Sequence, residues 1–225
     1  MAHRALMGLK KNLPNRLNKI KPLQNLLVLD FEATCVKDVI LKPQEIIEFP
    51  CLVVSTEDWQ VKDVFHEYIK PRINPKLSDF CTELTGIMQE TLEKEEHFPE
   101  VFSKFCSWIE DGNYFDEKDK SAFVTCGDWD LKVMLPSQCE LDNINVPDYL
   151  KEWINLKTSF CSMTKYYPRS LADMLRHLNM KFQGKNHCGI DDVHNMTRVI
   201  QKLADKYKAE FTINTKIEEE TKDSV

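Results

Sequence analysis

Two acidic residues, Asp30 and Glu32, directly follow a short apolar run at residues 26–29. Residues two apart in a strand project from the same face, so both carboxylates would lie on one side of the end of a buried strand. Paired negative charges are costly there unless a cation neutralises them. Taken alone, the pair fits a solvated strand end better than a metal site, so other acidic residues must decide.

A second acidic pair, Asp191 and Asp192, opens an expected helix at residues 190–207. Asp192 shares a helical face with Met196 and Val199, whereas Asp191 shares its face with polar residues. We therefore expect Asp191 to be solvated and favoured by the helix dipole. Asp192 needs a partner, and a metal ion, a structural arginine or a capping contact would each serve.

The third acidic segment is Cys126-Gly127-Asp128-Trp129-Asp130, which follows an apolar strand. Strand-to-helix junctions are where α/β proteins place ligand-binding side chains. Either acid could instead cap the next helix, and local pattern does not choose between them. Trp129, between the two acids, could pack in the core.

His187 lies in a polar loop, residues 184–189, just before the acidic pair. An imidazole has an unperturbed pKa close to neutral, so a histidine beside an inward-facing acid could act as a general base. A lone loop histidine is more often a surface residue. No competing GxSxG, Walker, GxGxxG or HExxH motif is found.

The elements that must position these residues alternate between strands and helices. Apolar and β-branched patterns predict strands at 26–29, 46–55, 61–69 and 122–124, and helices at 98–109, 129–135, 159–166, 170–178 and 190–207. We expect Pro136 to close the helix before it. This order predicts an α/β domain with a mixed sheet at residues 22–208, between a basic N-terminal arm, 1–21, and a charged C-terminal tail, 209–225.

Composition sets further bounds. A length of 225 residues suits one domain. A net charge of −6 argues against a general polyanion binder, but carboxylates that hold cations also count in this sum. Eight cysteines without a CxxC pair predict reduced thiols and no structural zinc. The apolar runs are too short to cross a membrane, and no signal peptide is evident, so we expect an intracellular protein of the cytoplasm or nucleus.

The order DxE, then a middle Asp, then HxxxxD resembles the DEDDh exonuclease superfamily. The amino-acid sequence around these motifs is similar to that of the Eri (enhanced-RNAi) exoribonucleases, which include the histone-mRNA 3′-end exonuclease and Snipper-like enzymes. The resemblance covers residues 22–205, and the stretches that carry it are 28–35, 84–87, 126–131, 187–192 and Asn195.

The resemblance implies a ribonuclease H-like fold, with a mixed five-stranded sheet flanked by helices. It implies that two Mg²⁺ ions, or Mn²⁺, are held by Asp30, Glu32, Asp130 and Asp192. Glu32 and His187 would be catalytic, with His187 as the general base. The implied substrate contacts are Phe31, Ala33, Thr34, Leu84, Thr85, Ile87, Trp129, Leu131 and His187. Lys185 and Arg169 are either phosphate contacts or ordinary surface charges.

The function implied is a 3′→5′ exoribonuclease that releases nucleoside 5′-monophosphates from RNA 3′ ends, in RNA processing or RNA interference. Two alternatives stay open: a DNA-degrading exonuclease with the same centre, and a catalytically idle RNA-binding or scaffold protein. Some relatives carry an N-terminal SAP-type module or a C-terminal zinc domain. Neither pattern is found here, so targeting through such modules is not implied. Oligomeric state is not indicated.

Overall fold

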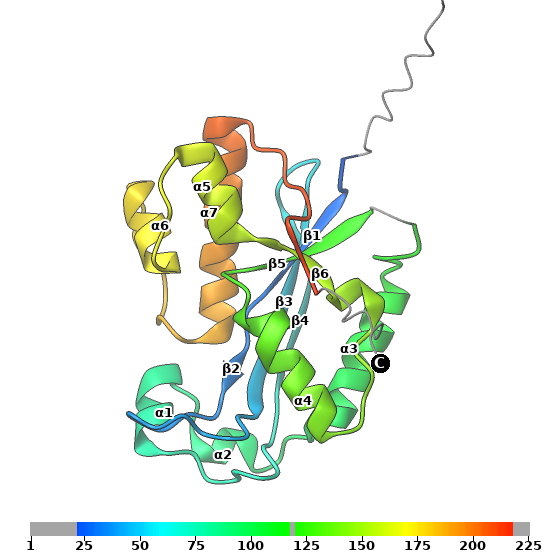
Figure 1. Cartoon of the computed structure of the whole chain (residues 1–225), viewed down its shortest axis with the longest axis vertical. Coiled ribbons are helices and arrows are strands. Elements are labelled where there is room, and N and C mark those ends of the chain that lie inside the picture. The colour runs from blue at the N-terminus through cyan, green and yellow to red at the C-terminus, as the bar shows by residue number, and fades with distance from the viewer. Residues whose placement is uncertain (1–21, 118–119, 218–225) are drawn as a thin grey trace, which may run out of the picture.

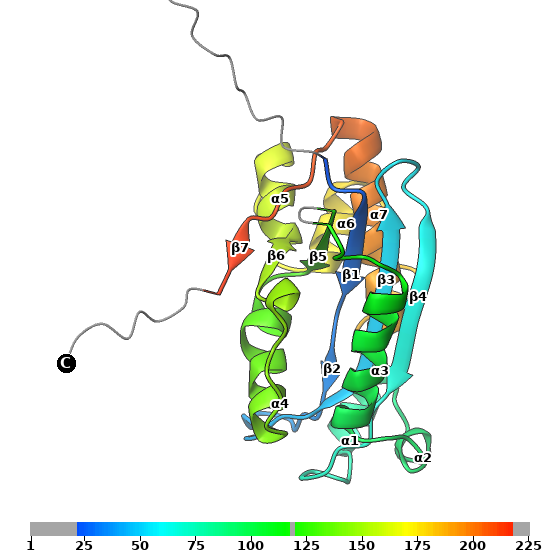
Figure 2. The ribbon, with the colours of Figure 1, turned by 90° about the vertical axis from the view of Figure 1, so that its right-hand side faces the viewer.

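A mixed β-sheet lies between two layers of helices in the computed structural model, which describes residues 22–117 and 120–217 (Figures 1 and 2). The strands are β1 (Asn25–Leu29), β2 (Glu32–Ala33), β3 (Ile46–Ser55), β4 (Val61–Tyr68), β5 (Ser121–Thr125), β6 (Glu152–Asn155) and β7 (Thr215–Lys216). The helices are α1 (Asp79–Thr85), α2 (Gln89–Leu92), α3 (Phe98–Asp111), the π-helix η1 (Asp130–Met134), α4 (Leu135–Leu141), the 3₁₀-helix η2 (Asp148–Leu150), α5 (Leu156–Thr164), α6 (Leu171–His177) and α7 (Gly189–Tyr207).

The sheet has the strand order β2-β3-β1-β5-β6-β7, and β4 pairs with the outer side of β3. Strands β1, β5 and β6 run parallel, whereas β3, β4 and β7 pair antiparallel to their neighbours. The predicted mixed sheet is confirmed, but its strand number is not: seven strands pair among the described residues. The two additional strands, β2 and β7, have two residues each, too short to leave a hydrophobic pattern.

Each face of the sheet carries its own hydrophobic core because side chains of β1 alternate between the two faces. Leu27 and Leu29 pack with α3 and α4, and Leu26 and Val28 pack with α5, α6 and α7. Figure 2 shows these two helical layers on opposite sides of the sheet. All four residues are fully buried, as expected for a central strand covered on both faces.

The segment after β5 differs from the sequence expectation. Pro136 does not close a helix; it lies in the first turn of α4, directly after the π-helix η1. The N–H of Leu135 bonds to Asp130 O, five residues back, so a π-helical turn directly precedes the proline and the helix continues through it. The two helices together therefore run from Asp130 to Leu141.

The C-terminal boundary also differs from expectation. Residues 209–217 return to the domain: Ala209 and Phe211 are buried, and β7 pairs with β6. The expected charged tail, 209–225, therefore begins with folded residues, and its last part, 218–225, lies outside the described residues, as does the expected arm 1–21. In the described ranges, no helix has the length and apolar character that a membrane span requires.

Phe49 of β3 is the centre of the aromatic cluster beneath α3. Its fully buried ring lies 4.7 Å from Phe31, 5.3 Å from Phe65 and 4.4 Å from Phe105, measured between ring centroids. Edge-to-face and tilted pairs of this kind add to the free energy of burial.

We predict that Phe49→Ala lowers the free energy of unfolding by about 3–5 kcal/mol, the usual cost of removing a fully buried aromatic ring. Denaturant unfolding followed by circular dichroism measures this change. Val64→Ala in β4 is the control, because Val64 is 47% exposed and its truncation should change stability by no more than about 0.5 kcal/mol. Equal losses in both variants would contradict this account of the core.

Candidate active site

A break between β1 and β2 presents the first two acidic residues. Leu29 pairs with Cys51 and Glu32 pairs with Glu48, so the continued register places Pro50 opposite the break. Proline has no N–H to donate to a ladder. Beyond the break, the N–H of Phe31 donates to Asp130 Oδ1 at 2.9 Å. Asp30 and Glu32 follow the alternation of Leu26 and Val28 onto the α7 face of the sheet.

Asp130 rather than Asp128 lies at this break. It is 5% exposed, begins η1 and accepts the Phe31 N–H. Asp128 has a structural contact instead: its Oδ1 accepts hydrogen bonds from the Trp153 indole at 3.2 Å and the Asn155 amide at 2.8 Å. The structure thus separates two acids that the sequence alone could not.

Asp192 and His187 meet at the N-terminal end of α7. Asp192 is 5% exposed and its Oδ2 accepts the backbone N–H of His187 at 2.8 Å. His187 adopts a positive φ of 67°, an uncommon conformation that this bond helps to hold. No ion pair in the described ranges involves Asp192, so none of the described arginines is its structural partner.

Asp191 is not the solvated acid that the helical pattern predicted. It is half-buried, and its Oδ2 accepts the Lys185 N–H at 2.7 Å. A Cβ on Gly184, whose φ is +81°, would lie 2.3 Å from the Asp191 carboxylate. Asn195 adds to this anchoring, because its side chain exchanges hydrogen bonds with the backbone of Gln183. The loop that carries His187 is therefore fixed on α7.

Glu32, His187 and Asp192 each offer one ligand atom, and these atoms lie within 4.8 Å of one another. Burial and the neighbouring carboxylates raise the pKa of Glu32 to about 9. Burial raises the pKa of Asp192 to about 7 and that of Asp130 to about 6, although backbone N–H donors oppose both shifts. The pKa of Asp30 is raised well above its usual value by burial and by repulsion from the other acids.

This cluster has the character of a divalent-cation site. No ion pair in the described part of the chain neutralises Asp30, Glu32, Asp130 or Asp192. Oxygen ligands from carboxylates suit hard cations such as Mg²⁺ and Mn²⁺. A cation bound among these carboxylates would favour their ionised form and so lower their pKa values.

Only some of the predicted substrate contacts have accessible side chains. Leu84 is partly exposed, Trp129 is 40% exposed and His187 is exposed, which excludes core packing for Trp129. The remaining side chains are buried, with exposed fractions of 7% or less: Phe31, Ala33, Thr34, Thr85, Ile87 and Leu131. These side chains pack in the core or bond to the backbone, so contact with a substrate at these six positions stays a prediction.

Thr34 and Thr85 show how buried side chains of this group bond to the backbone. Thr34 Oγ1 accepts the Glu45 N–H at 2.9 Å. Thr85 Oγ1 donates to Cys81 O at 2.9 Å and accepts the Ile87 N–H at 3.1 Å. Both hydroxyl groups hold the backbone beside the site.

Sequence reasoning missed two further residues, one beside the stretch 84–87 and one beside the acids. Met88, which is 54% exposed, follows Ile87 and adds an accessible apolar side chain. Glu48 is completely buried in β3 and raises the pKa values of Asp30, Glu32 and Asp192. The position of Glu48 inside a ten-residue apolar strand, which is buried throughout, was the signal that could have identified it.

Of the two basic residues with open roles, Lys185 lies at the site. Its Nζ donates to Glu83 O of α1 at 2.8 Å, and its charge lowers the pKa of Glu32. Arg169 is exposed before α6, where its backbone N–H bonds Asp173.

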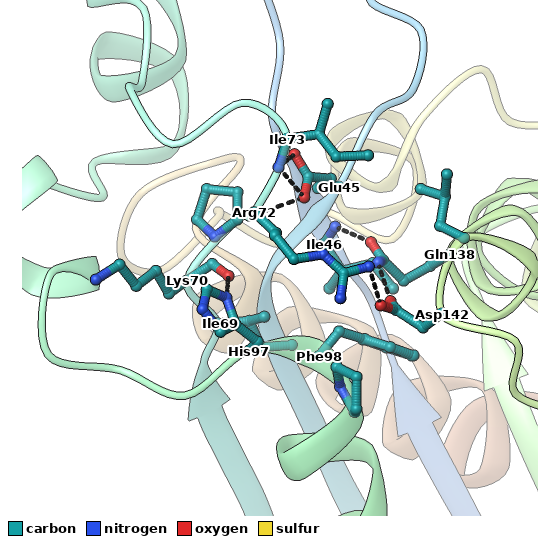
Figure 3. A pocket seen from close by; sticks show the side chains of 13 residues that line it. Glu45, Ile46, Ile69, Lys70, Arg72, Ile73, His97, Phe98, Gln138 and Asp142 are labelled. Carbon is teal, nitrogen blue, oxygen red and sulfur yellow. Dashed lines mark hydrogen bonds and ion pairs between the residues drawn. The ribbon is translucent and has the colours of Figure 1, made fainter.

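A separate polar network lies where the loop at 70–74 meets β3 and α4 (Figure 3). The Glu45 carboxylate accepts the N–H groups of Arg72 and Ile73, and Arg72 pairs with Asp142. Gln138 Oε1 accepts the Ile46 N–H at 3.0 Å. This network fixes α4 against the start of β3. None of the five predicted catalytic residues lines the pocket beside it.

Comparison with known proteins places this arrangement in a family. The sequence model of the exonuclease family (RNase_T) matches residues 27–200. The chain belongs to this family. Human ERI1 exoribonuclease 3 is 44% identical over 179 residues, which cover 79% of this chain and 53% of that protein. The 3′-5′ exonuclease Snipper of Drosophila melanogaster is 32% identical over 208 residues, which cover 86% of this chain and 74% of Snipper.

Solved structures agree with the sequence matches. The nuclease domain of 3′hExo, a DEDDh family member bound to rAMP, superposes with a TM-score of 0.80 at 36% identity, covering 87% of this chain and 98% of that domain. A 3′-exonuclease that recognises the histone mRNA stem-loop superposes with a TM-score of 0.81 at 35% identity, covering 88% of each chain. The expected DEDDh resemblance and ribonuclease H-like fold are confirmed. The chain spans about half the length of the mammalian ERI1 exoribonuclease 3 proteins.

We predict that the metal-free protein loses stability relative to its Glu32→Gln variant as pH rises. The pKa of Glu32 is about 9 in the folded protein against 4.5 as its ordinary value, so the cost of ionising it in the fold grows between these pH values. Unfolding in EDTA at pH 5 and pH 8 should give a difference of more than about 1 kcal/mol, the equivalent of one pKa unit. Adding Mg²⁺ should stabilise the wild type more than the variant. Parallel pH curves would contradict the raised pKa.

Proposed function

We propose that the protein is a metal-dependent 3′→5′ exoribonuclease that releases nucleoside 5′-monophosphates from RNA 3′ ends. The observation that carries this proposal is the convergence of four acids with His187 at one break in the sheet: Asp30 in the break after β1, Glu32 in β2, Asp130 in η1 and Asp192 in α7. Family membership and the names of the relatives support the reaction class. The proposal covers the folded unit, which was expected at 22–208 and extends through the residues that return to the sheet.

The residues present fit two divalent cations, Mg²⁺ or Mn²⁺. Asp30, Glu32, Asp130 and Asp192 would hold them, because these carboxylates are buried close together and none forms an ion pair within the described residues. When bound, the cations would lower the pKa of a water molecule and would stabilise the negative charge that develops at the phosphate.

His187 is the general base in this proposal. Partial burial lowers its pKa below the ordinary value of 6.5, so the imidazole is neutral at pH 7 and accepts a proton from the attacking water. The water oxygen bonds to phosphorus while the bond to the 3′ oxygen of the preceding nucleotide breaks, which releases the terminal nucleotide. The anchored loop keeps the imidazole beside Glu32 and Asp192 during this transfer.

The terminal base would contact accessible apolar side chains, which do not distinguish one base from another. Leu84 and Met88, on either side of the α1–α2 connection, and Trp129 have accessible apolar side chains. Stacking and apolar contact accept any base, because every base has an aromatic face. Lys185 beside these side chains supplies a positive charge for phosphate.

All eight cysteines are free thiols, five of which are only partly buried. Free thiols at accessible positions fit a reducing compartment. This supports the proposal that the protein acts inside the cell, in the cytoplasm or nucleus.

We predict that Asp30→Asn and His187→Ala each reduce the release of mononucleotides from 3′-labelled single-stranded RNA by about 10²–10⁴-fold, the range for loss of a catalytic group. Mononucleotides are resolved by chromatography in Mg²⁺ or Mn²⁺, with EDTA as the metal-free reference. Asp205→Asn and His194→Ala are matched controls, since both residues are exposed on α7 away from the cluster. Full activity in His187→Ala would overturn its role. A wild type that is inactive on RNA in all metals would leave the two alternatives, a DNA-degrading exonuclease and a catalytically idle RNA-binding or scaffold protein.

We predict that RNA is degraded at least about 10-fold faster than a DNA strand of the same sequence. A contact to the 2′-hydroxyl group is what distinguishes RNA from DNA at a given site. The two strands, carrying different fluorophores, compete in one reaction, and the ratio of initial rates is measured. A ratio of one or less would favour the DNA-degrading alternative.

A further inference from the structure

We propose that Glu48 is a positioning residue that anchors the N-terminal end of α7 to the central sheet and thereby sets Asp192 and His187 against Asp30 and Glu32. The proposal rests on the proposed exonuclease function, because it assigns Glu48 a role in assembling that same site. The residue lies on β3, so it acts through α7 rather than on the substrate.

The position of Glu48 is electrostatically unfavourable unless something holds it. It lies directly opposite Glu32 in the β2–β3 pairing, where side chains of paired residues share one face. Like charges in such a pair destabilise a sheet. The Glu48 side chain is also completely buried and raises the pKa values of three of the four site acids. An acid at this position therefore needs a strong compensating contact.

The compensating contact is the N-terminal end of α7. Glu48 Oε2 accepts the Gly189 N–H at 2.9 Å, and Oε1 accepts the Ile190 N–H at 3.1 Å. The helix's own N-cap residue, Cys188, makes no side-chain capping bond. Glu48 therefore satisfies two N–H groups that helix geometry leaves without partners, and its charge interacts favourably with the helix dipole.

Strand β4, which pairs with the other side of β3, also contacts Glu48. His66 Nε2 of β4 lies 2.8 Å from Glu48 Oε1. Both carboxylate oxygens of Glu48 thus have protein partners, and neither is exposed. Glu48 is consequently a poor candidate for a further metal ligand, although it is an acid beside the cluster.

Close packing makes this contact specific. A Cβ on Gly189 would lie 3.1 Å from the Glu48 carboxyl group and 3.0 Å from Pro50 Cγ. Only glycine lets the helix approach β3 so closely without displacing a neighbour. Three residues after Gly189, Asp192 faces Glu32, and its carboxylate holds the His187 N–H. A shift of the first turn of α7 would therefore move the base and one metal ligand together.

The test compares Glu48→Ala with Glu48→Gln, which keeps one oxygen as an acceptor. For each variant, amide hydrogen exchange at Gly189 and Ile190 is measured by NMR, and kcat and KM are measured on single-stranded RNA with Mg²⁺. We expect faster exchange at both amides in Glu48→Ala and a kcat lower by about 10- to 100-fold, as for misplacement of reacting groups by about 1 Å. KM should change by less than about threefold, and Glu48→Gln should recover part of both losses.

Two controls separate positioning from stability. Glu67→Gln removes an acid from β4 that does not contact α7 and should behave as the wild type. Leu203→Ala removes a fully buried side chain from the other end of α7 and should lower stability by about 2–5 kcal/mol while leaving the kcat of the folded protein unchanged.

Unchanged exchange and kcat in Glu48→Ala, or an equal loss of kcat in Leu203→Ala, would overturn the positioning role. If Glu48→Ala does not fold, Glu48→Gln still tests the positioning role. It should show faster exchange at Gly189 and Ile190 and a lower kcat than the wild type, and wild-type values of both would overturn the role. A wild-type protein that releases no nucleotides contradicts the proposed function instead, and the exchange rates at Gly189 and Ile190 then still test the anchor.

Discussion

The structure depends on keeping four mutually repelling carboxylates within one partly buried space. Their charges come from three separate parts of the chain. Burial raises every one of their pKa values, and repulsion between carboxylates adds to the rise for Asp30, Glu32 and Asp192. Backbone N–H groups supply the nearest favourable contacts: Phe31 donates to Asp130, and His187 donates to Asp192. The rest of the fold serves as a rigid frame that holds these acids together in the absence of the cations that they are suited to bind.

Much of the frame could be predicted because it follows from periodicity. The buried strands β1 and β3, the amphipathic helices α3 and α7, and the inward position of Asp192 all follow from which residues are apolar and at what spacing. The choice of the site acids needed more than spacing. Asp130 was preferred over Asp128 by resemblance alone, and the contacts of Asp128 with Trp153 and Asn155 give the physical reason.

The parts that could not be predicted arise from contacts between distant segments. Asp191 has the helical position of a solvated residue, yet the loop folds back so that its carboxylate holds Lys185 and leaves no room for a side chain at residue 184. Buried residues beside the motifs, such as Leu131 and Thr85, resemble substrate contacts in sequence because they adjoin residues that reach the site. No local pattern reports which way such a side chain faces. Helix continuation through Pro136 likewise depends on the π-turn before it.

The pairing of β7 with β6 has a consequence for shortened versions of the chain. Beyond β6 in the strand order lies only β7, so β7 covers the hydrogen-bonding edge of a strand whose last three residues are buried. A protein cut at residue 208 would expose that edge and also uncover the apolar surface under Phe211. Unpaired edges next to apolar surface recruit other strands. Self-association of a truncated enzyme would then originate at the side of the sheet farthest from β4, and its loss of activity would say nothing about catalysis.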